Sequence, residues 1–263
     1  MRLTFLGTGS TSAPPLYGCA CAVCTDARFN SGLRRRPASA LVEAGVTRLL
    51  VDAGLMNLAE RFSSGDFPTI LLTHFHPDHV QGLFHLRWGL GKRIPTHCPP
   101  DPEGCADLYK NPGLLDFRPM RKFEPLHEGA VTITPVPLIH SKVTLGYCLE
   151  HQGGRIAYLT DTAGLPPRTE AFLRDWQPSA LVIDCSHPPH PPQSPQSVAP
   201  KNHNDLTLAL AVIAAIRPER AWLTHIGHEL DAWLKDNGHS LPAQVFVARD
   251  GDVIDLSSGM PAR

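Results

Sequence analysis

The sequence TILLT at residues 69–73 runs directly into HFHPDH at residues 74–79. The first five residues are mainly β-branched or aliphatic, a composition that predicts a short buried strand. The next six place three imidazoles and one carboxylate in a single loop at the end of that strand. Histidine and aspartate are common ligands of metals that catalyse hydrolysis, so this stretch predicts a metal site. A histidine tag fits less well, because a tag would be terminal and would lack the aspartate.

Length and composition favour one soluble globular domain. The chain has 263 residues, of which 42% are hydrophobic and 19% charged, and its formal net charge is -1. This length provides the volume for a full core, and a nearly neutral chain has no global field that attracts nucleic acid or an acidic membrane. Because the 26 prolines are dispersed and we see no repeat or linker, we expect residues 1–263 to form a single domain. The basic run Arg34–Arg36 is more typical of a solvated turn than of a phosphate clamp.

The amino terminus and the cysteines indicate the compartment. Residues 1–6 contain too short an apolar run for a signal peptide, and no stretch approaches the roughly 20 apolar residues of a spanning helix. We therefore expect a cytoplasmic protein without a membrane partner. Three of the seven cysteines crowd at Cys19, Cys21 and Cys24, and in a reducing compartment this spacing favours a metal over a disulfide. The others show no partner pattern and are expected to be packing residues: Cys98, Cys105, Cys148 and Cys185.

The order of apolar runs and turn residues predicts a chain that mixes strands and helices. A hairpin is expected around Gly45, and Asn204 or Asp205 is expected to cap a helix that ends at Ile216. Residues 95–125 are rich in proline and glycine and are expected to be mostly irregular, and the proline-rich residues 187–200 are expected to form a loop. Further strands are predicted at residues 1–6, 39–44, 48–54, 130–139, 145–150, 155–160, 180–184, 221–224 and 244–248, and further helices at 55–63 and 80–90.

Several predicted strands end on a residue that can bind a metal. LTH at 72–74, LTD at 159–161 and LTH at 223–225 share one form, and another strand ends at His140. Because strand ends concentrate functional residues, we predict His140, Asp161 and His225 as further ligands. Seven ligands exceed the need of one ion and suit two ions about 3.5–4 Å apart that share a carboxylate. Such a pair activates water and stabilises attacking and leaving oxygens, which is hydrolase chemistry, above all on phosphate esters.

The motif HFHPDH resembles the H-x-H-x-D-H signature of the metallo-β-lactamase superfamily, whose fold is a four-layered αββα sandwich. The resemblance extends to LGTGS at 6–10, to LVDAG at 50–54 and to the three later ligand candidates. Among the branches, the chain looks most like the phosphodiesterases of the carbon–phosphorus lyase pathway for phosphonate breakdown. The stretches that point to this branch are the Cys-x-Cys-x-x-Cys run at 19–24, KNHNDL at 201–206 and THIGH at 224–228.

The resemblance implies a ligand set and a reaction. One ion would be held by His74, His76 and His140, and the other by Asp78, His79 and His225, with Asp161 bridging them. The branch is active with manganese, although these ligands also accept zinc or iron. Its members cleave 5-phosphoribosyl 1,2-cyclic phosphate to ribose 1,5-bisphosphate. His203 matches the residue that protonates the leaving alkoxide, a role that suits imidazole near neutral pH. The implied catalytic residues are thus His203 and the ligand Asp78.

By the same resemblance, a structural zinc is expected near the active site. Three thiolates leave a zinc ion one ligand short, and the resemblance supplies His228 as the fourth, beside a zinc-binding loop at about residues 18–25. Asp52, which ends a strand, is expected to accept a hydrogen bond from a ligand histidine and so to fix its tautomer. Asp184 could orient a loop in a similar way.

Two other functions are weighed against a cyclic phosphodiesterase. The transfer-RNA 3′-processing endonuclease of this superfamily holds RNA with a long arm and a basic surface, and neither is visible here. The accessory protein of pyrroloquinoline quinone biosynthesis shares the cysteine run, but its dinuclear motif is degraded, whereas all seven positions are intact in this chain. We expect a small cyclic phosphate as the partner, with nucleic acid disfavoured. The sequence leaves monomer and homodimer open.

Overall fold

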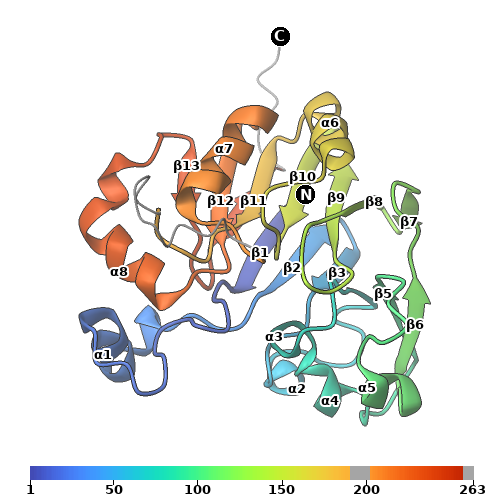
Figure 1. Cartoon of the computed structure of the whole chain (residues 1–263). Coiled ribbons are helices and arrows are strands. Elements are labelled where there is room, and N and C mark those ends of the chain that lie inside the picture. The colour runs from blue at the N-terminus through green and yellow to red at the C-terminus, as the bar shows by residue number, and fades with distance from the viewer. Residues whose placement is uncertain (190–201, 257–263) are drawn as a thin grey trace.

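The computed structural model describes residues 1–189 and 202–256, and in it two β-sheets pack face to face with helices on both outer sides (Figure 1). In the described residues the first sheet has the strand order β14 (Val253–Asp255), β1 (Arg2–Gly7), β2 (Ser39–Ala44), β3 (Thr47–Val51), β4 (Thr69–Leu71), β5 (Ile94–Cys98) and β6 (Leu115–Pro119). The second has the order β13 (Val245–Val247), β12 (Arg220–Thr224), β11 (Ala180–Asp184), β10 (Gly154–Leu159), β9 (Leu145–His151), β8 (Val131–Pro137) and β7 (Leu126–Glu128).

The helices divide between the two sheets. Helices α2 (Leu58–Arg61), α3 (Pro77–Val80), α4 (Leu83–Leu86) and α5 (Ala106–Lys110) follow strands of the first sheet. Helices α6 (Pro167–Trp176), α7 (Leu206–Ile216) and α8 (His228–Asn237) cover the second sheet, and α1 (Ala22–Phe29) lies beside α8 (Figure 1). Short 3-10 turns occupy Ser31–Leu33 and Gly238–Ser240. None of the helices in these described ranges is long and apolar enough to span a membrane.

Three apolar layers hold this sandwich together. Alternate residues of one strand point to opposite faces of its sheet. In β3, Leu49 packs between the two sheets, whereas Leu50 packs under the helices of the first sheet. In β11, Val182 packs between the sheets and Ile183 under the helices of the second. Strands buried on both faces read as continuous apolar runs, which is why the sequence shows them clearly. The predicted four-layered αββα sandwich is confirmed.

The strand directions bring the candidate ligands to one edge. Strands β3 to β6 are parallel, as are β10 to β13. Strand β8 has the direction of β10, because β9 is antiparallel to both. The carboxyl ends of parallel strands meet at the same edge of a sheet, where sites are commonly built. Loops that follow β4, β8, β10 and β12 therefore start from shared edges.

The region 95–125, which was predicted to be mostly irregular, contains more regular structure than its composition suggests. It contains most of β5, all of α5 and all of β6. Strands β5 and β6 pair in parallel, from Ile94 opposite Leu115 to Cys98 opposite Pro119. Their prolines weaken the sequence signal for a strand, but β6 is an edge strand, where a missing N–H is tolerated. Tertiary pairing outweighs local composition here.

Two predicted helices are shorter than expected, and a third is confirmed. The helix expected at 80–90 is reduced to α4, because the N–H of Gly82 donates to the carbonyl of Ala53 instead of continuing α3. A Cβ at Gly82 would lie 2.1 Å from the carbonyl oxygen of Leu55, so the chain approaches too closely there for any other residue. The helix expected at 55–63 is only α2. Helix α7 is capped by Asp205, whose carboxylate accepts from the N–H of Leu208 at 2.8 Å.

Candidate metal centre

All seven predicted ligands gather at the edges where the two sheets meet. Their donor atoms form two groups, each of which falls within 4.8 Å. The first group comes from the loops after β4, β8 and β10, and the second from α3 and the loop after β12. The first group is His74, His76, His140 and Asp161, and the second is Asp78, His79 and His225.

The first group consists of imidazole nitrogens that face one another. Nδ1 of His76 lies 2.9 Å from Nε2 of His74 and 2.9 Å from Nε2 of His140. His140 donates its Nδ1–H to the carbonyl of Asn202 at 2.9 Å. Nδ1 of His74 lies 3.1 Å from Oγ1 of Thr73, whose own proton goes to a carboxylate. These bonds fix the tautomers of His74 and His140 with the proton on Nδ1, so the Nε2 atom of each ring carries a lone pair. Convergent lone pairs repel one another unless a cation lies between them.

The second group is built in the same way. Nε2 of His225 lies 3.3 Å from Oδ2 of Asp78, and Nε2 of His79 lies 3.5 Å from that same oxygen. The opposite nitrogen of each ring is engaged. His79 donates its Nδ1–H to Asp52 at 2.8 Å, and Nδ1 of His225 lies 3.0 Å from Oγ of Ser186. Here too the Nε2 atoms point at a carboxylate oxygen.

Asp161 stands between the groups and offers one oxygen to each. Its Oδ2 lies 3.5 Å from Nε2 of His74 and 3.6 Å from Nε2 of His140. Its Oδ1 lies 3.2 Å from Nε2 of His79 and 3.5 Å from Nε2 of His225. Ligands about 2.0–2.2 Å from one ion are spaced about 3–3.5 Å apart. Within the described residues, Oδ1 of Asp161 and Nε2 of His79 are buried and lack hydrogen-bond partners. Such atoms are expected where side chains bind a metal ion.

The electrostatics of the groups suit cations. Burial raises the pKa of Asp161, but the imidazoles of His225 and His79 outweigh it and hold the pKa well below its usual range. Burial lowers the pKa of His74 far below its ordinary value and also lowers the pKa of His140. For His79, burial acts downward, but Asp161 and Asp52 raise the pKa well above normal. An ionised carboxylate beside neutral imidazoles is the form that binds metals, and an ion displaces the proton that His79 otherwise holds.

Three residues of the centre adopt the left-handed backbone conformation, which non-glycine residues rarely use. Asp52, Asp161 and His225 have φ values of 57°, 62° and 59°. Each follows a strand end, where the turn aims the side chain toward the gap between the sheets. Such conformations cost roughly 1–3 kcal/mol and persist only where the surroundings hold them. These left-handed turns at the strand ends explain why the side chains of the three residues point into the site.

His203 lies beside the two groups and is held by Asp184. Its Nδ1–H donates to Oδ2 of Asp184 at 2.9 Å, and its ring stacks on that of His225 with centroids 4.9 Å apart. Burial lowers the pKa of His203, but the bond to Asp184 outweighs it and raises the pKa to about 9. The other oxygen of Asp184 accepts from Oγ of Ser186 at 2.9 Å. The expected orienting role of Asp52 is matched by its bond to His79, and Asp184 orients two side chains.

The contacts that sequence reasoning missed are those of Thr73, Ser186 and Asn202. The hydroxyl of Thr73 donates to both oxygens of Asp52, at 3.1 and 2.9 Å, and its oxygen accepts from Nδ1–H of His74. The Leu-Thr-His form of the strand end could have identified it. Ser186 follows β11 by two residues, and Asn202 acts through its backbone. Neither leaves a signal in the sequence.

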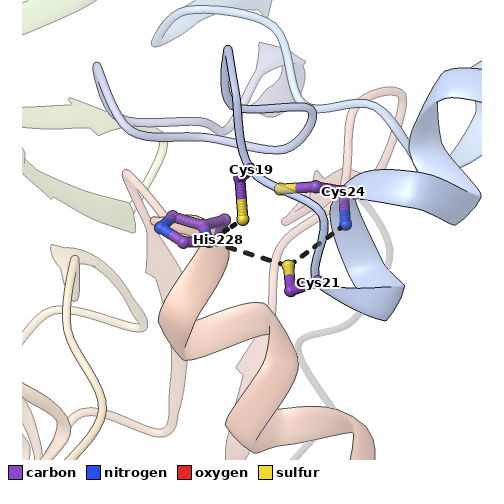
Figure 2. Close-up of side chains that lie close together, drawn as sticks. All are labelled: Cys19, Cys21, Cys24 and His228. Carbon is purple, nitrogen blue, oxygen red and sulfur yellow. Dashed lines mark hydrogen bonds between the residues drawn. The ribbon is translucent and has the colours of Figure 1, made fainter.

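The predicted cysteine cluster is assembled at the start of α8 (Figure 2). Nδ1 of His228 lies 3.7 Å from Sγ of Cys19 and 3.8 Å from Sγ of Cys21, while Cys24 donates its N–H to Cys21 at 3.5 Å. With Zn–S near 2.3 Å and Zn–N near 2.0–2.1 Å, tetrahedral geometry places such ligands about 3.5–3.8 Å apart. The bond to His228 lowers the pKa of Cys21 to about 6. Donor type and spacing therefore fit zinc.

Two hollows border the centre. One, of about 570 Å³, is lined by His76, Ser141 and Lys142 together with Asp101 and its neighbours. Another, of about 350 Å³, reaches Asp78. Each is large enough for a small ligand beside the metal groups.

The basic run 34–36 differs from its prediction as a solvated turn. Arg35 is buried and forms a two-pronged ion pair with Asp231, with N–O distances of 2.6 and 2.8 Å. Its other contacts go to Thr8 and the carbonyl of Ala248. The run is not a free phosphate clamp. Residues 190–200 of the proline-rich loop, and Lys201 of KNHNDL, lie outside the described residues.

Comparison with known proteins shows which sequences and structures this chain resembles. Curated relatives include an octanoyltransferase of Porphyromonas gingivalis, 28% identical over 177 residues that cover 61% of this chain and 35% of that protein. Coenzyme PQQ synthesis protein B of Methylobacterium radiotolerans is 25% identical over 197 residues, which cover 62% of this chain and 66% of that protein. The chain thus matches about a third of the first relative and just under two thirds of the second.

Solved structures match over nearly the whole chain. A diphosphatase from the PhnP family has a TM-score of 0.80 at 25% identity and covers 97% of this chain and 98% of its own. Zinc-bound PqqB from Methylobacterium extorquens has a TM-score of 0.77 at 19% identity, covering 97% and 100%. The short form of human tRNase Z has a TM-score of 0.69 at 16% identity, covering 98% and 100%.

The resemblance drawn from the motifs is thereby confirmed at the level of the superfamily and of its PhnP-like branch. The beta-lactamase superfamily domain matches residues 47–226, a range that includes HFHPDH and the three later ligand candidates. With its sandwich fold and two ligand groups at the sheet edges, the chain belongs to the metallo-β-lactamase superfamily.

Proposed function

We propose that this protein is a dinuclear metal-dependent phosphodiesterase that hydrolyses a small cyclic phosphate. The observation that carries the proposal is the position of Asp161, whose two oxygens face separate groups of imidazole nitrogens. A shared carboxylate is the usual feature of a two-ion hydrolytic site. Similarity to a diphosphatase from the PhnP family, at 25% identity, supports phosphate chemistry.

The ligand assignment follows the two groups. His74, His76 and His140 would hold one divalent ion, and Asp78, His79 and His225 the other, with one oxygen of Asp161 for each. We propose manganese as the resident metal because the resemblance to the PhnP-like branch implies it, although imidazole and carboxylate donors also accept zinc or iron. Ions held there would lower the pKa of water and stabilise negative charge on phosphate oxygens.

The chain's own contribution to the reaction comes from His203. Hydrolysis forms a bond from water oxygen to phosphorus and breaks the bond from phosphorus to an ester oxygen, which must gain a proton. His203 donates Nδ1–H to Asp184, so its Nε2–H is available for the leaving oxygen. The ring is partly exposed beside His140 and His225, where a substrate at the ions would meet it. Asp184 keeps it protonated near neutral pH.

The substrate class is argued from size and charge. The hollow of about 570 Å³ that begins at His76 suits a small molecule. A chain with a net charge of -1 has no overall positive charge that would attract RNA. Within this class, the resemblance to the PhnP-like branch leads us to propose 5-phosphoribosyl 1,2-cyclic phosphate as the substrate, with ribose 1,5-bisphosphate as the product, in phosphonate breakdown.

A structural zinc and a single domain complete the proposal. Cys19, Cys21, Cys24 and His228 would hold the zinc, since their donor atoms lie within 4.8 Å of one another. Residues 1–263 would then act as one hydrolase domain with the zinc-binding loop near 18–25.

One other function has a specific observation in its favour. Two similar proteins are of the PqqB type, one by sequence and one by structure. A non-hydrolytic accessory role would need no working pair of ions, whereas here the buried Asp161 and its four facing imidazoles are in place. The intact pair favours the hydrolase.

Metal analysis combined with turnover tests the function. Purified protein should contain about three ions per chain, one of which survives mild chelation. Manganese should then restore hydrolysis of the ribosyl cyclic phosphate faster than that of a 2′,3′-cyclic nucleotide, a dinucleoside diphosphate or a transfer-RNA precursor. A preference for the diphosphate or the precursor would replace the proposed substrate. No turnover of any of them with both ions bound would refute the enzyme and favour the accessory role.

A further inference from the structure

The four residues 225–228 join the two candidate metal sites. His225 belongs to the second ligand group, and His228 belongs to the cysteine cluster. We infer that the cysteine cluster positions His225 and thereby sets the affinity of the second catalytic ion, but not that of the first. This inference rests on the proposed function, because it assumes that both sites hold metals.

The residues between the two histidines are paired with the amino-terminal loop. The N–H of Ile226 donates to the carbonyl of Thr8 at 2.9 Å, and its carbonyl accepts from Ser10 at 3.2 Å. The N–H of His228 donates to the carbonyl of Ser12 at 2.9 Å. Residues 8–12 therefore lie against 226–228 as an added strand would, and the position of one segment determines the position of the other.

The cysteine cluster closes this pairing at its far end. The chain continues from Ser12 to Cys19, whose sulfur lies 3.7 Å from Nδ1 of His228. On the way the N–H of Leu16 donates to the sulfur of Cys24 at 3.3 Å. Figure 2 shows the three sulfur-bearing side chains around the ring of His228, at the first turn of α8. Hydrogen bonds to sulfur are weak, so a bound ion would hold the cysteine cluster together more firmly than these bonds do.

His225 needs such support more than an ordinary ligand does. Its φ of 59° is in the left-handed region, where a non-glycine residue persists only if its neighbours hold it. On one side Ser186 provides this support, since its Oγ lies 3.0 Å from Nδ1 and 2.9 Å from the carbonyl oxygen of His225, and its carbonyl accepts from the N–H of Gly227 at 3.2 Å. On the other side the support is the pairing with residues 8–12.

The first ligand group has no comparable connection. Its imidazoles come from the loops after β4 and β8, and they are anchored by Thr73 and Asn202. Within the described ranges, no hydrogen bond joins them to residues 8–24. Release of the cysteine cluster should therefore loosen His225 and leave the imidazoles of the first group in place, which makes the expected effect selective.

Manganese titration of His228→Ala tests this coupling. Stepwise binding is followed by calorimetry and by electron paramagnetic resonance, neither of which requires turnover. We expect the variant to lose the chelation-resistant ion and to bind the second manganese about 10- to 100-fold more weakly, the usual effect of removing a group that positions a ligand. Binding of the first manganese should match that of the unaltered protein.

Two further variants keep the test decisive. Cys21→Ser opens the cluster from the other segment and should give the same selective loss, whether or not His228→Ala folds. Cys105→Ser removes a partly exposed thiol that lies outside the cluster, and it should leave both affinities unchanged.

The inference is overturned if the cluster variants bind both manganese ions as the unaltered protein does, and the proposed function then still stands. It is also overturned if both affinities fall together, because the coupling is then not selective. If the unaltered protein binds no pair of ions, the inference and the proposed function fail together.

Discussion

Two buried carboxylates, one from each sheet, support the candidate centre in different ways. Asp52 follows β3 and is devoted to the first sheet's loop: it accepts from the backbone and hydroxyl of Thr73 and from Nδ1 of His79. Asp184 ends β11 and divides its oxygens. One accepts from Ser186, which contacts His225, and the other accepts from His203.

The two carboxylates therefore differ in role. Asp52 holds metal ligands in place, whereas Asp184 also supports the proposed proton donor. Every hydrogen bond found for the carboxylate of Asp52 leads to a ligand or to the loop that carries one, so loss of this carboxylate should affect folding and metal binding. Around Asp184 one carboxylate serves a ligand and the proposed proton donor, so its loss should affect metal binding and turnover together. Substitutions on the two sides should therefore give distinguishable results.

The largest expected effect is that of His203→Ala on turnover. Loss of a positioned proton donor typically slows a reaction about 10²- to 10⁴-fold. Because His203 is not among the seven proposed ligands, metal content should not change. Steady-state kinetics with a cyclic phosphodiester, together with metal analysis of the same sample, measures both. Full activity in this variant would show that His203 takes no part in the reaction.

Asp184→Asn should reduce turnover about 100-fold, because an amide holds neither the charge nor the ring position of His203 as a carboxylate does. Unlike His203→Ala, it should also weaken the second ion, through Ser186 and His225. Kinetics and manganese titration on one preparation would separate the two effects. Loss of turnover with unchanged binding would break the proposed sharing of this carboxylate.

The pH profile sharpens this prediction. Burial lowers the pKa of His203, and Asp184 raises it to about 9. A proton donor works below its pKa, so turnover should fall as pH rises through that value, and bound cations move the fall to lower pH. In Asp184→Asn the largest of the influences that raise this pKa is removed, so the alkaline fall should shift further toward neutral pH. Identical alkaline limbs in both proteins would contradict the assignment of His203.

Asp52→Asn should act mainly on stability and on the metal. The side chain is fully buried and accepts three hydrogen bonds, and a buried donor left without an acceptor costs about 1–3 kcal/mol. Chemical denaturation should show a loss of this size, and the second ion should bind about 10-fold more weakly. At saturating metal, turnover should stay within a few-fold of normal. A loss of turnover equal to that of Asp184→Asn would erase the contrast between the two carboxylates.

Ser186→Ala should have the smallest effect. It cuts the path from Asp184 to His225 but leaves the bond between Asp184 and His203 in place. We expect weaker binding of the second ion, by several-fold to about 10-fold, with an unchanged alkaline limb. A shifted limb would show that Ser186 acts on His203 as well.

The parts of the centre that could be predicted are those delivered by regular strands. Continuous apolar runs such as residues 180–184 mark strands buried on both faces, and a polar residue at the end of such a run is conspicuous. For this reason HFHPDH, His140, Asp161 and His225 could be brought together in advance, and the structure does bring them together.

What could not be predicted depends on tertiary contacts without a local signature. Strand β6 forms because β5 offers it a parallel edge, and residues 95–125 read as irregular without that partner. Arg35 is buried because Asp231, almost 200 positions away, pairs with it. Two ligand histidines are oriented by the hydroxyl of Ser186, which lies in a loop, and by the backbone carbonyl of Asn202. Loop serines and backbone carbonyls occur throughout any sequence, so they could not be identified as partners in advance.

In the proposed dinuclear centre, Asp161 lies between two ions. A crystal structure of the manganese-loaded protein, with anomalous scattering recorded for manganese and for zinc, tests it most directly. We expect two manganese peaks about 3.5–4 Å apart, one beside each oxygen of Asp161, and a zinc peak between Cys19, Cys21, Cys24 and His228. A single manganese peak, or two that do not share Asp161, would contradict it.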